Sequence, residues 1–444
     1  MTGGVVSPSS ARESLIAWEE YRREPSRLVH ALRFAGTSIS SEIDVGAPEP
    51  MADPKGAWWT ALRSGAVPRP AAQLARPFRA VDLFCGPGGL ALGARNLCTE
   101  IGLPVRTELI VDEDEEATDV YASNHDTRIR RIASVASLVD FRLRRRGTDA
   151  AFVYEPEIVE PKLAAAARGV DVVVAGPPCQ GHSNLNNQTR RDDVRNALYL
   201  TVPAFAVAAR ARMAIVENVP EVTSDRSRVV QTARRLFESA GYSVEEGILS
   251  ADAMGWPQTR RRHFLVARID AAPIPIREVS RALAEARPRP VWWAIGDLET
   301  RSGDDPMDRA AELSPENRQR VDWLFDNDEY DLPCSERPEC HRESTSYPSV
   351  YSRMRRDVPA QTITTGFMTP GRGRYVHPTQ RRTLTPREAA RLQGFPDSYR
   401  FVTDPQRPPS RAKLAKWIGD AVPMPLGYGA ALSAIGGDVS PFLR

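Results

Sequence analysis

Residues 80–94, AVDLFCGPGGLALGA, contain the pattern that decides the fold: an apolar run, a glycine-rich turn and an apolar helical stretch. The run Ala80–Phe84 predicts a buried strand that leads into the turn. Gly86, Gly88 and Gly89 would let the backbone approach a ligand closely at the carboxyl end of this strand. Open parallel sheets bind nucleotide-like cofactors there, although a plain tight turn explains the glycines equally well.

Further apolar runs separated by helical segments follow along the chain. They are Thr107–Val111, Val170–Ala175, Met213–Val216 and His263–Ile269. The alternation predicts an α/β fold, with a doubly wound, Rossmann-like parallel sheet that has helices on both faces. Near Pro273 the composition changes to proline, arginine and acidic residues, which predicts a second, smaller, loop-rich domain.

The same changes suggest domain boundaries. Residues 1–76 form an N-terminal extension of unknown role, in which an amphipathic helix is expected near residues 15–34. Residues 77–270 form the sheet domain, which residues 411–444 complete, and residues 271–410 form the smaller domain.

A capped helix is expected late in the smaller domain. In RRTLTPREAARLQGFP, Thr385 is the predicted N-cap, and Pro386 lies in the first turn. Glu388 closes a capping box, and Gly394 ends the helix.

The composition excludes several classes of protein. A chain of 444 residues suffices for roughly two to four domains, and its 41% hydrophobic and 26% charged residues disfavour disorder. With 59 basic and 57 acidic side chains the net charge is +2, so any surface for a polyanion must be local. No apolar run approaches the ~18 residues that span a bilayer, and the polar start MTGGVVSPSSARES is unlike a secretory signal. Five irregularly spaced cysteines do not indicate a disulfide framework and leave room for a working thiol.

The segment DVVVAGPPCQGHS places Cys179 just beyond the end of a predicted strand. Parallel α/β sheets build active sites at that edge. A cysteine on a loop braced by two prolines is a candidate nucleophile, whereas a lone cysteine is more often a small buried apolar residue. The residues on the later strands favour the nucleophile.

Two later apolar runs adjoin ionisable residues. MAIVENVP places Glu217 directly after a run, where desolvation could keep the carboxyl group protonated and able to donate to a base nitrogen. QTRRRHFLVARI places Gln258, Arg260 and Arg262 ahead of another run, and alternation puts the two arginines on one face. A solvated charge run does not account for arginines directly before a buried strand.

These segments resemble the cytosine-5 DNA methyltransferases, which use S-adenosyl-L-methionine. The resemblance covers roughly residues 79–270 and 381–432 and keeps the order of the family's motifs. DLFCGPGG is similar to the cofactor loop, GPPCQGHS to the catalytic loop, ENV to the base-binding acid and QTRRRHF to the arginine motif. LTPREAARLQGFPDSYRF and IGDAVPMPL are similar to the two C-terminal motifs. This combination of motifs is highly specific.

The resemblance implies a set of cofactor-binding residues. Phe84 would lie against the adenine of S-adenosyl-L-methionine, Asp112 would bind its ribose, and Asp82 with residues 86–90 would hold its methionine part. The full implied set is Asp82, Phe84, Gly86, Gly88, Gly89, Leu90, Asp112, Glu113, Pro178 and Asp420. Glu113 replaces the aromatic residue that is common in the family, and Asp420 replaces the commoner asparagine.

The resemblance also implies the mechanism. Cys179 would add to carbon 6 of cytosine, Glu217 would bind ring nitrogen 3, and Arg262 with Arg260 would support the base and the loop. Carbon 5 would take the methyl group, after which loss of its proton and elimination of Cys179 restore the ring. The cytosine must first leave the duplex, because stacking covers both faces of carbon 6.

DNA contacts are expected from the catalytic loop and from the smaller domain, which would recognise the target and form a cleft for duplex DNA. Thr362 and Ile363 match the family's pair of a threonine and a branched apolar residue. The expected DNA-binding residues are Gln180, Ser183, Arg195, Gln258, Thr362, Ile363, Arg372 and Arg374. For any single arginine, an exposed loop position without a DNA contact is an equally good explanation.

Several expectations concern partners. Cys334, Cys340 and His341 lack ordinary zinc-knuckle spacing and a fourth ligand, so no metal is expected. We expect a monomer in the bacterial cytoplasm, associated with the nucleoid and not with a membrane, and a cognate restriction endonuclease that acts separately.

Two alternative functions stay open. One is an RNA cytosine-5 methyltransferase, whose CFT signature is not found here, and the other is a catalytically silent DNA-binding relative.

Overall fold

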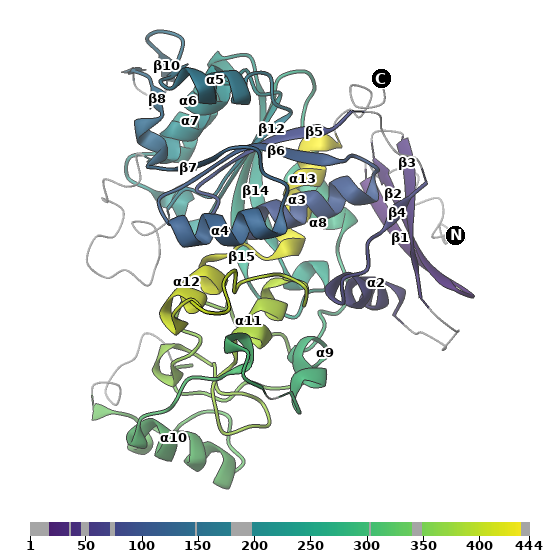
Figure 1. Cartoon of the computed structure of the whole chain (residues 1–444), viewed down its shortest axis with the longest axis vertical. Helices are drawn as coiled ribbons and strands as arrows, with labels where there is room; N and C mark the ends of the chain where they lie inside the picture. The colour runs from purple at the N-terminus through teal and green to yellow at the C-terminus, as the bar shows by residue number, and fades with distance from the viewer. Residues whose placement is uncertain are drawn as a thin grey trace, which may run out of the picture. The chain divides into compact units, whose positions relative to one another are not determined.

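The computed structural model describes residues 17–34, 37–45, 53–71, 76–146, 149–178, 198–301, 303–339 and 349–436 (Figure 1). The chain forms two compact units. The first comprises residues 1–250, 261–284 and 424–444, and the second comprises residues 251–260 and 285–423.

Within the described residues, a seven-stranded sheet forms the centre of the first unit, in the order β14-β15-β13-β12-β5-β6-β7. Its strands are β5 (Phe78–Leu83), β6 (Val105–Asp112), β7 (Arg130–Ile132), β12 (Val172–Ala175), β13 (Met213–Asn218), β14 (Ser243–Ser250) and β15 (Arg261–Arg268). The strands from β13 to β7 run parallel, whereas β15 pairs antiparallel with both of its neighbours. The predicted α/β fold and its five apolar strands are confirmed, but the sheet is mixed and not wholly parallel, because the strand expected at His263–Ile269 is antiparallel.

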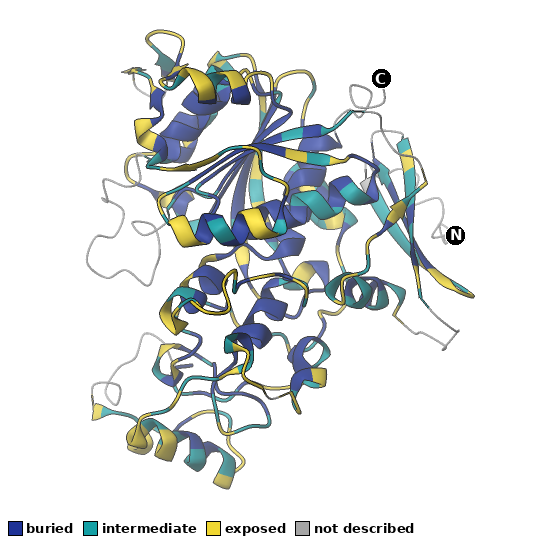
Figure 2. Ribbon diagram, viewed as in Figure 1, coloured by how far each residue is buried: buried dark blue, intermediate teal, exposed yellow. Residues whose placement is uncertain are grey.

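Helices cover both faces of this sheet (Figure 1). One face carries α3 (Gly89–Glu100), α4 (Glu115–Asn124) and α13 (Met424–Ile435), and the other carries α5 (Pro161–Ala167), α6 (Thr201–Ala208) and α7 (Val229–Ser239). Alternate strand residues such as Val81 and Val173 pack against α5, α6 and α7 in one apolar core. Figure 2 shows the central strands buried almost throughout. Each fully buried aliphatic side chain there contributes about 1.5–3 kcal/mol to folding.

Two glycines bring α3 and α13 into close contact. A Cβ added to Gly93 would overlap the backbone of Met424 and Tyr428, and one added to Gly427 would lie 2.6 Å from the carbonyl oxygen of Leu90. Glycine inside a helix costs up to about 1 kcal/mol relative to alanine, so close packing must offset that cost here. This contact fixes α3, the helix that begins at the glycine-rich turn.

An insertion between β7 and β12 adds two small hairpins to the first unit. β8 (Val139–Asp140) pairs with β11 (Glu157–Ile158), and β9 (Leu143–Arg146) pairs with β10 (Asp149–Phe152). The hairpins pack on α6 and α7, and Figure 1 shows them beside these helices.

The N-terminal segment forms a second sheet, so the helix predicted near residues 15–34 is wrong. Its strands are β1 (Ala17–Glu24), β2 (Arg27–Phe34), β3 (Thr37–Asp44) and β4 (Arg69–Pro70), and α2 (Pro54–Arg63) packs on β1 and β2. Pro25 lies in the turn between β1 and β2, where it would interrupt a helix. Leu28, His30, Leu32 and Phe34 alternate along β2 and are buried, which is the period of a strand.

The second unit has few regular elements. They include α9 (Val291–Ile295), α10 (Pro315–Asp326), α11 (Pro386–Gln393) and α12 (Arg411–Asp420), joined by turns and short 3-10 helices. The predicted capping box of α11 is confirmed. The Thr385 N–H donates to Glu388 Oε2 at 2.8 Å, and the Glu388 N–H donates to the Thr385 hydroxyl at 3.2 Å.

A buried cluster of charged side chains joins the N-terminal sheet to the first unit's core. Lys55 of α2 forms an ion pair with Glu19 of β1. His30 Nδ1 lies 3.0 Å from Glu100 Oε2, and His30 Nε2 lies 3.4 Å from Glu19 Oε2, an ion-pair contact without hydrogen-bond geometry. All four side chains are at most 7% exposed. Breaking one partner of such a buried set typically costs about 3–5 kcal/mol.

Aromatic residues complete the cluster. Trp58 Nε1 donates to Glu100 Oε1 at 3.1 Å, and the Tyr428 hydroxyl donates to Glu100 Oε2 at 2.6 Å. The Tyr21 ring stacks on His30 with 4.2 Å between centroids, and its hydroxyl donates to Glu19. The Glu100 carboxylate thus links α2, β2 and α13 to the end of α3.

Two pKa values set the pH range in which the cluster is stable. Burial alone would lower the pKa of His30, but Glu100 and Glu19 raise it from 6.5 to about 9. Burial alone would raise the pKa of Glu19, but Lys55 and His30 lower it from 4.5 to about 2. The stability from His30 is fully present below pH 6.5 and is lost as the pH rises to about 9, whereas that from Glu19 is lost as the pH falls from 4.5 to about 2.

We therefore predict that the free energy of unfolding of the first unit falls by up to about 3 kcal/mol between pH 6.5 and pH 9. His30→Gln should be less stable at pH 6 and should lose most of this pH dependence. Urea unfolding at several pH values measures both effects. Arg27→Gln is the control, because Arg27 makes exposed ion pairs on the same sheet and its loss should leave both the stability and the pH slope close to those of the parent. An unchanged pH slope in the His30 variant would contradict the prediction.

Candidate active site

The carboxyl ends of β5, β6, β12 and β13 lie at one edge of the sheet, because these strands are parallel. The glycine-rich turn and residues 176–178 follow β5 and β12, whereas Asp112 is the last residue of β6 and Glu217 the last but one of β13. Segments from distant parts of the sequence therefore meet at one edge of the first unit, where open α/β sheets place ligands.

The turn after β5 has a left-handed backbone at three of its five residues. The φ angles are +54° at Phe84, +49° at Gly86 and +94° at Gly88. The Gly86 N–H donates to Asp112 Oδ2 at 2.8 Å, and the Asp114 N–H donates to Asp112 Oδ1 at 2.9 Å. A Cβ added to Gly86 would meet no atom within 4 Å, so the space in front of the turn is open. A left-handed phenylalanine is costly, and such strain is often found at ligand sites.

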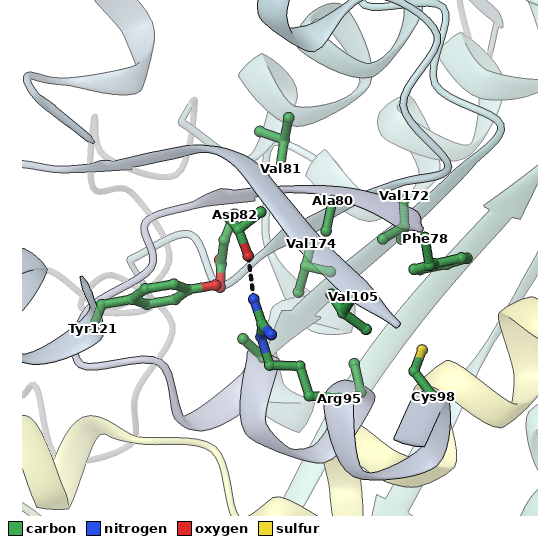
Figure 3. Close-up of a pocket in the computed structure, with 13 residues that line it drawn as sticks. Phe78, Ala80, Val81, Asp82, Arg95, Cys98, Val105, Tyr121, Val172 and Val174 are labelled. Carbon is green, nitrogen blue, oxygen red and sulfur yellow. Dashed lines mark hydrogen bonds between the residues drawn. The ribbon is translucent and has the colours of Figure 1, made fainter. Parts of the chain in front are cut away.

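Asp82 lies beneath this turn, in a cavity between the sheet and α3. Figure 3 shows its carboxyl group directed toward Arg95 and Tyr121, with Cys98 further along α3. Burial raises the pKa of Asp82 to about 8, and a hydrogen bond with Tyr121 only partly opposes this shift. Among the described residues, Asp82 Oδ2 has no hydrogen-bond partner. Arg95 is held by Thr107, whose hydroxyl lies 2.5 Å from its Nη2.

Glu217 and Arg262 form an ion pair at the edge. Arg262 Nε lies 2.7 Å from Glu217 Oε1, and the two side chains are 13% and 10% exposed. A Cβ added to Gly176 would lie 3.5 Å from Glu217 Oε2, so the carboxylate lies against the start of the loop that leads to Cys179. The sequence suggests a desolvated carboxyl group at this position, and the structure pairs it with a cation.

Asn218 supports the same loop, a role that the sequence did not reveal. Its side-chain amide donates to the Pro177 carbonyl oxygen at 3.2 Å and accepts from the Val219 N–H at 2.8 Å. It is 2% exposed. The only signal in the sequence is a polar residue directly after a buried run and next to Glu217.

Arg260 and Gln258 organise the second unit. Arg260 donates to the carbonyl oxygens of Ile363 at 2.6 Å, Gly419 at 3.0 Å and Asp420 at 3.2 Å. Gln258 donates to the Leu392 carbonyl oxygen at 2.8 Å and accepts from the Ile363 N–H at 3.1 Å. Arg260 precedes β15 and bonds within the second unit, whereas Arg262 bonds to Glu217 in the first. The two arginines therefore bind different partners, and only Arg262 belongs to β15.

The remaining predicted residues of the second unit differ in accessibility. Ile363 and Gln258 are completely buried. Arg374 donates to the carbonyl oxygens of Tyr330 and Arg353 and pairs with Asp331, whereas Arg372 is exposed. The Thr362 carbonyl oxygen accepts from the Tyr375 hydroxyl at 2.9 Å. The exposed Asp420 carboxylate pairs with Lys416 at 3.1 Å.

The other predicted residues fall into two groups. In the first unit, Gly88, Gly89 and Leu90 are buried at the start of α3, Pro178 is half-buried, and Glu113 is exposed. Cys179, Gln180, Ser183, Arg195, Cys340 and His341 lie outside the described residues. Cys334 is an exposed free thiol. In the described part of the chain, no helix is long and apolar enough to cross a membrane.

A sheet of this topology, with a left-handed glycine turn and an acidic side chain after the next strand, is typical of an α/β enzyme that binds a nucleotide-like cofactor. The profile of the C-5 cytosine-specific DNA methylase family matches residues 78–434. The chain belongs to this family and is a DNA cytosine-5 methyltransferase.

Relatives agree with this assignment. The type II methyltransferase M1.BsuMI of Bacillus subtilis is 38% identical, and the match covers 79% of each chain. The type II methylase M.HgiDII of Herpetosiphon aurantiacus is 31% identical over 78% of this chain and 92% of its own. The Dnmt2 methyltransferase of S. pombe has the same fold, with a TM-score of 0.52 and 15% identity over 80% of this chain and 98% of that chain.

We predict that Arg260→Ala loosens the second unit locally, because three carbonyl oxygens lose their donor. Each buried acceptor left without a partner costs about 1–3 kcal/mol. Hydrogen exchange should become faster in peptides that cover residues 359–365 and 417–421. Arg407→Ala is the control, since Arg407 is exposed on a loop of the same unit. Exchange at the parent rate in the Arg260 variant would show that these hydrogen bonds contribute little.

Proposed function

We propose that this enzyme transfers a methyl group from S-adenosyl-L-methionine to carbon 5 of a flipped-out cytosine in a specific duplex DNA sequence, through a covalent adduct with Cys179. The observation that carries the proposal is the Glu217–Arg262 ion pair. It lies against Gly176, at the start of the loop that leads to Cys179, and on the same edge as the glycine turn.

The residues of the edge fit S-adenosyl-L-methionine. The open space at Gly86 leaves room for a ligand against the backbone, and the half-buried Phe84 in the same turn would supply an aromatic contact. The Asp112 carboxylate is an acceptor of the kind that ribose hydroxyl groups require. The N-terminus of α3 favours a negatively charged group such as a carboxylate. Bound there, S-adenosyl-L-methionine would supply an electrophilic methyl group on a sulfonium sulfur.

Asp82 would act from beneath the turn. Its carboxyl group is only 3% exposed, and one of its oxygen atoms has no partner among the described residues. We therefore propose that Asp82 shapes the turn and its charge, whereas residues 86–90 contact the methionine part. Glu113 is exposed and Asp420 belongs to the second unit, so their cofactor contacts stay predictions.

The chain's own residues would activate the base. The Cys179 thiolate adds to carbon 6 of the cytosine, which makes carbon 5 nucleophilic. Glu217 shares a proton with ring nitrogen 3 and so stabilises the negative charge that the addition creates. Arg262 holds the Glu217 carboxylate in place. After methylation the carbon 5 proton leaves to a base, the carbon–sulfur bond breaks, and the thiolate is regenerated.

The second unit, within residues 271–410, would recognise the target DNA sequence. Arg372 is exposed and free of an ion pair among the described residues, so it is the better candidate for a base contact, whereas Arg374 is already bonded. Gln258 and Ile363 are buried, and we propose that they position the segment that carries Thr362. Gln180, Ser183 and Arg195 would approach the DNA from the catalytic loop.

The type II names of the relatives suggest a restriction–modification system, with an endonuclease that acts separately. The monomeric state and the cytoplasmic, nucleoid-associated location stay predictions. Two alternatives are an RNA cytosine-5 methyltransferase and a catalytically silent DNA-binding protein. Both are tested by offering duplex DNA and transfer RNA in the same methyl-transfer assay. Transfer to RNA alone, or to neither, would overturn the proposed function.

We predict that Cys179→Ser lowers methyl transfer to DNA about a thousandfold or more, because serine is a far weaker nucleophile at neutral pH. Tritiated cofactor and genomic DNA give the rate, and calorimetry with the cofactor shows whether the cofactor site persists. Cys334→Ser is the matched control, since Cys334 is an exposed free thiol, and it should keep full activity. If the Cys179 variant retains a rate within a fewfold of the parent, Cys179 is not the nucleophile.

We further predict a stable covalent complex with DNA that contains 5-fluorocytosine at the target. Fluorine at carbon 5 cannot leave as a cation, so Cys179 cannot be eliminated after methyl transfer. A denaturing gel should show a shifted, cofactor-dependent band with the parent and with Cys334→Ser, and none with Cys179→Ser. Absence of the band on DNA that the parent methylates would exclude the covalent route.

A further inference from the structure

We propose that the first unit carries a second DNA surface, which binds the phosphate backbone beside the target base. We call it the arginine arm. It consists of exposed arginines on the β9–β10 hairpin and on the loop before α7: Arg142, Arg144, Arg145, Arg146, Arg226 and Arg228. The inference rests on the proposed function, because it assumes a duplex DNA substrate.

The hairpin has an apolar face and a basic face. In the antiparallel register, Leu143 lies opposite Phe152 and Arg145 lies opposite Ala150. Leu143, Phe152 and Ala150 pack on the core of the first unit. Residues two apart on a strand share a face, so Arg142, Arg144 and Arg146 project to the other side, where they are exposed. The hairpin is thus anchored by one face and presents arginines on the other.

The arginine arm lies next to the segment that follows β13, the strand that contains Glu217. β13 ends at Asn218, η3 (Pro220–Ser224) follows, and Ser227 lies ten residues after Glu217. Arg145 Nη1 donates to the Ser227 carbonyl oxygen at 3.5 Å, and β10 packs on α7. Arg226 and Arg228 flank Ser227 and are exposed. The loop that follows the Glu217 strand therefore contacts the hairpin, and both carry exposed arginines.

Most arginines of the arm are not matched by a carboxylate among the described residues. Among the described residues, Arg142, Arg144, Arg145, Arg146 and Arg228 form no ion pair. Elsewhere in the first unit, exposed arginines are commonly paired; Arg106 and Arg128, for example, both bind Glu108. Carboxylates also lie close to the arm in sequence: Asp149 faces Arg146 across the hairpin, Asp140 accepts from the Tyr154 hydroxyl, and Asp225 directly precedes Arg226. Neighbouring like charges repel, and a polyanion relieves that repulsion.

The spacing suits a phosphate backbone. Alternate residues of a strand are about 6.8 Å apart, so three outward arginines extend over about 14 Å. Phosphates of one DNA strand follow every 3.4 Å or so along the helix axis, and several can therefore face this row. Guanidinium groups bind phosphate oxygens in a planar fork. The row contains no amide or hydroxyl side chain to read base edges, so the arm would position the DNA and leave the choice of sequence to other residues.

The test compares two triple variants with the same loss of charge. The arm variant is Arg142→Ala, Arg144→Ala and Arg146→Ala. The control variant is Arg128→Ala, Arg277→Ala and Arg281→Ala, which removes exposed arginines that already have carboxylate partners in the first unit. The probe is a fluorescent 30-base-pair duplex of random sequence. The dissociation constant of each protein for this duplex is measured between 50 and 300 mM salt. Transfer of a tritiated methyl group to DNA by the parent is measured separately.

We expect the arm variant to bind about tenfold or more weakly, and its slope of log K against log salt to decrease by about 2–3, near 0.9 for each lost phosphate contact. The control variant should keep the parent's slope. If all three proteins have the same slope, or if both triple variants lose the same affinity for the duplex, the arginine arm does not bind the phosphate backbone. Lack of methyl transfer to DNA by the parent would instead overturn the proposed function, so the two failures are distinguishable.

Discussion

The site depends on one constraint, the parallel direction of the central strands. Parallel neighbours require a crossover connection, so each strand returns to the same side and all carboxyl ends meet at one edge. Four of these ends carry residues that lie far apart in the sequence: Gly86 and Gly176 follow their strands, and Asp112 and Glu217 lie in the last two positions of theirs. Because the backbone N–H of Gly86 binds Asp112, the turn is fixed in an open, left-handed shape before any ligand arrives. Such preorganisation lowers the cost of binding.

Charged side chains inside the first unit are held by opposite charges, and this determines how the added elements attach to the sheet. Glu100 at the end of α3 contacts His30, and Glu19 contacts Lys55, so the N-terminal sheet is joined to α3 by charge as well as by apolar packing. Removing one charge would leave its partner buried without compensation, which costs more than the pair contributes. Asp82 differs, since burial raises its pKa to about 8 and it lies directly beneath the glycine turn. An imperfectly satisfied carboxyl group in that place is typical of a functional site.

Patterns of neighbouring residues predicted much of the secondary structure of this molecule. Where these patterns predicted the wrong element, there is a physical reason. The apolar strands and the α11 capping box depend on neighbouring residues, which the sequence displays. The segment near residues 15–34 fits a helical period as well as a strand period, and only pairing of β1, β2 and β3 decides between them. Residues 315–326 form α10 behind an N-cap at Ser314, but few apolar residues mark that helix. Arg260 and Arg262 differ in role because a unit boundary falls between them.

The sequence by itself determined the α/β class, the order of the motifs and the chemical types at the site, because these depend on local periodicity and on residue identity. Tertiary structure alone decided which groups touch. It paired Glu217 with Arg262, placed Asp82 in the cavity between the sheet and α3, and brought Arg145 of β9 into contact with the loop that follows β13. Such contacts arise between residues that are distant in the chain. No single-sequence pattern encodes them, since they depend on how strands pair and on which face each side chain occupies.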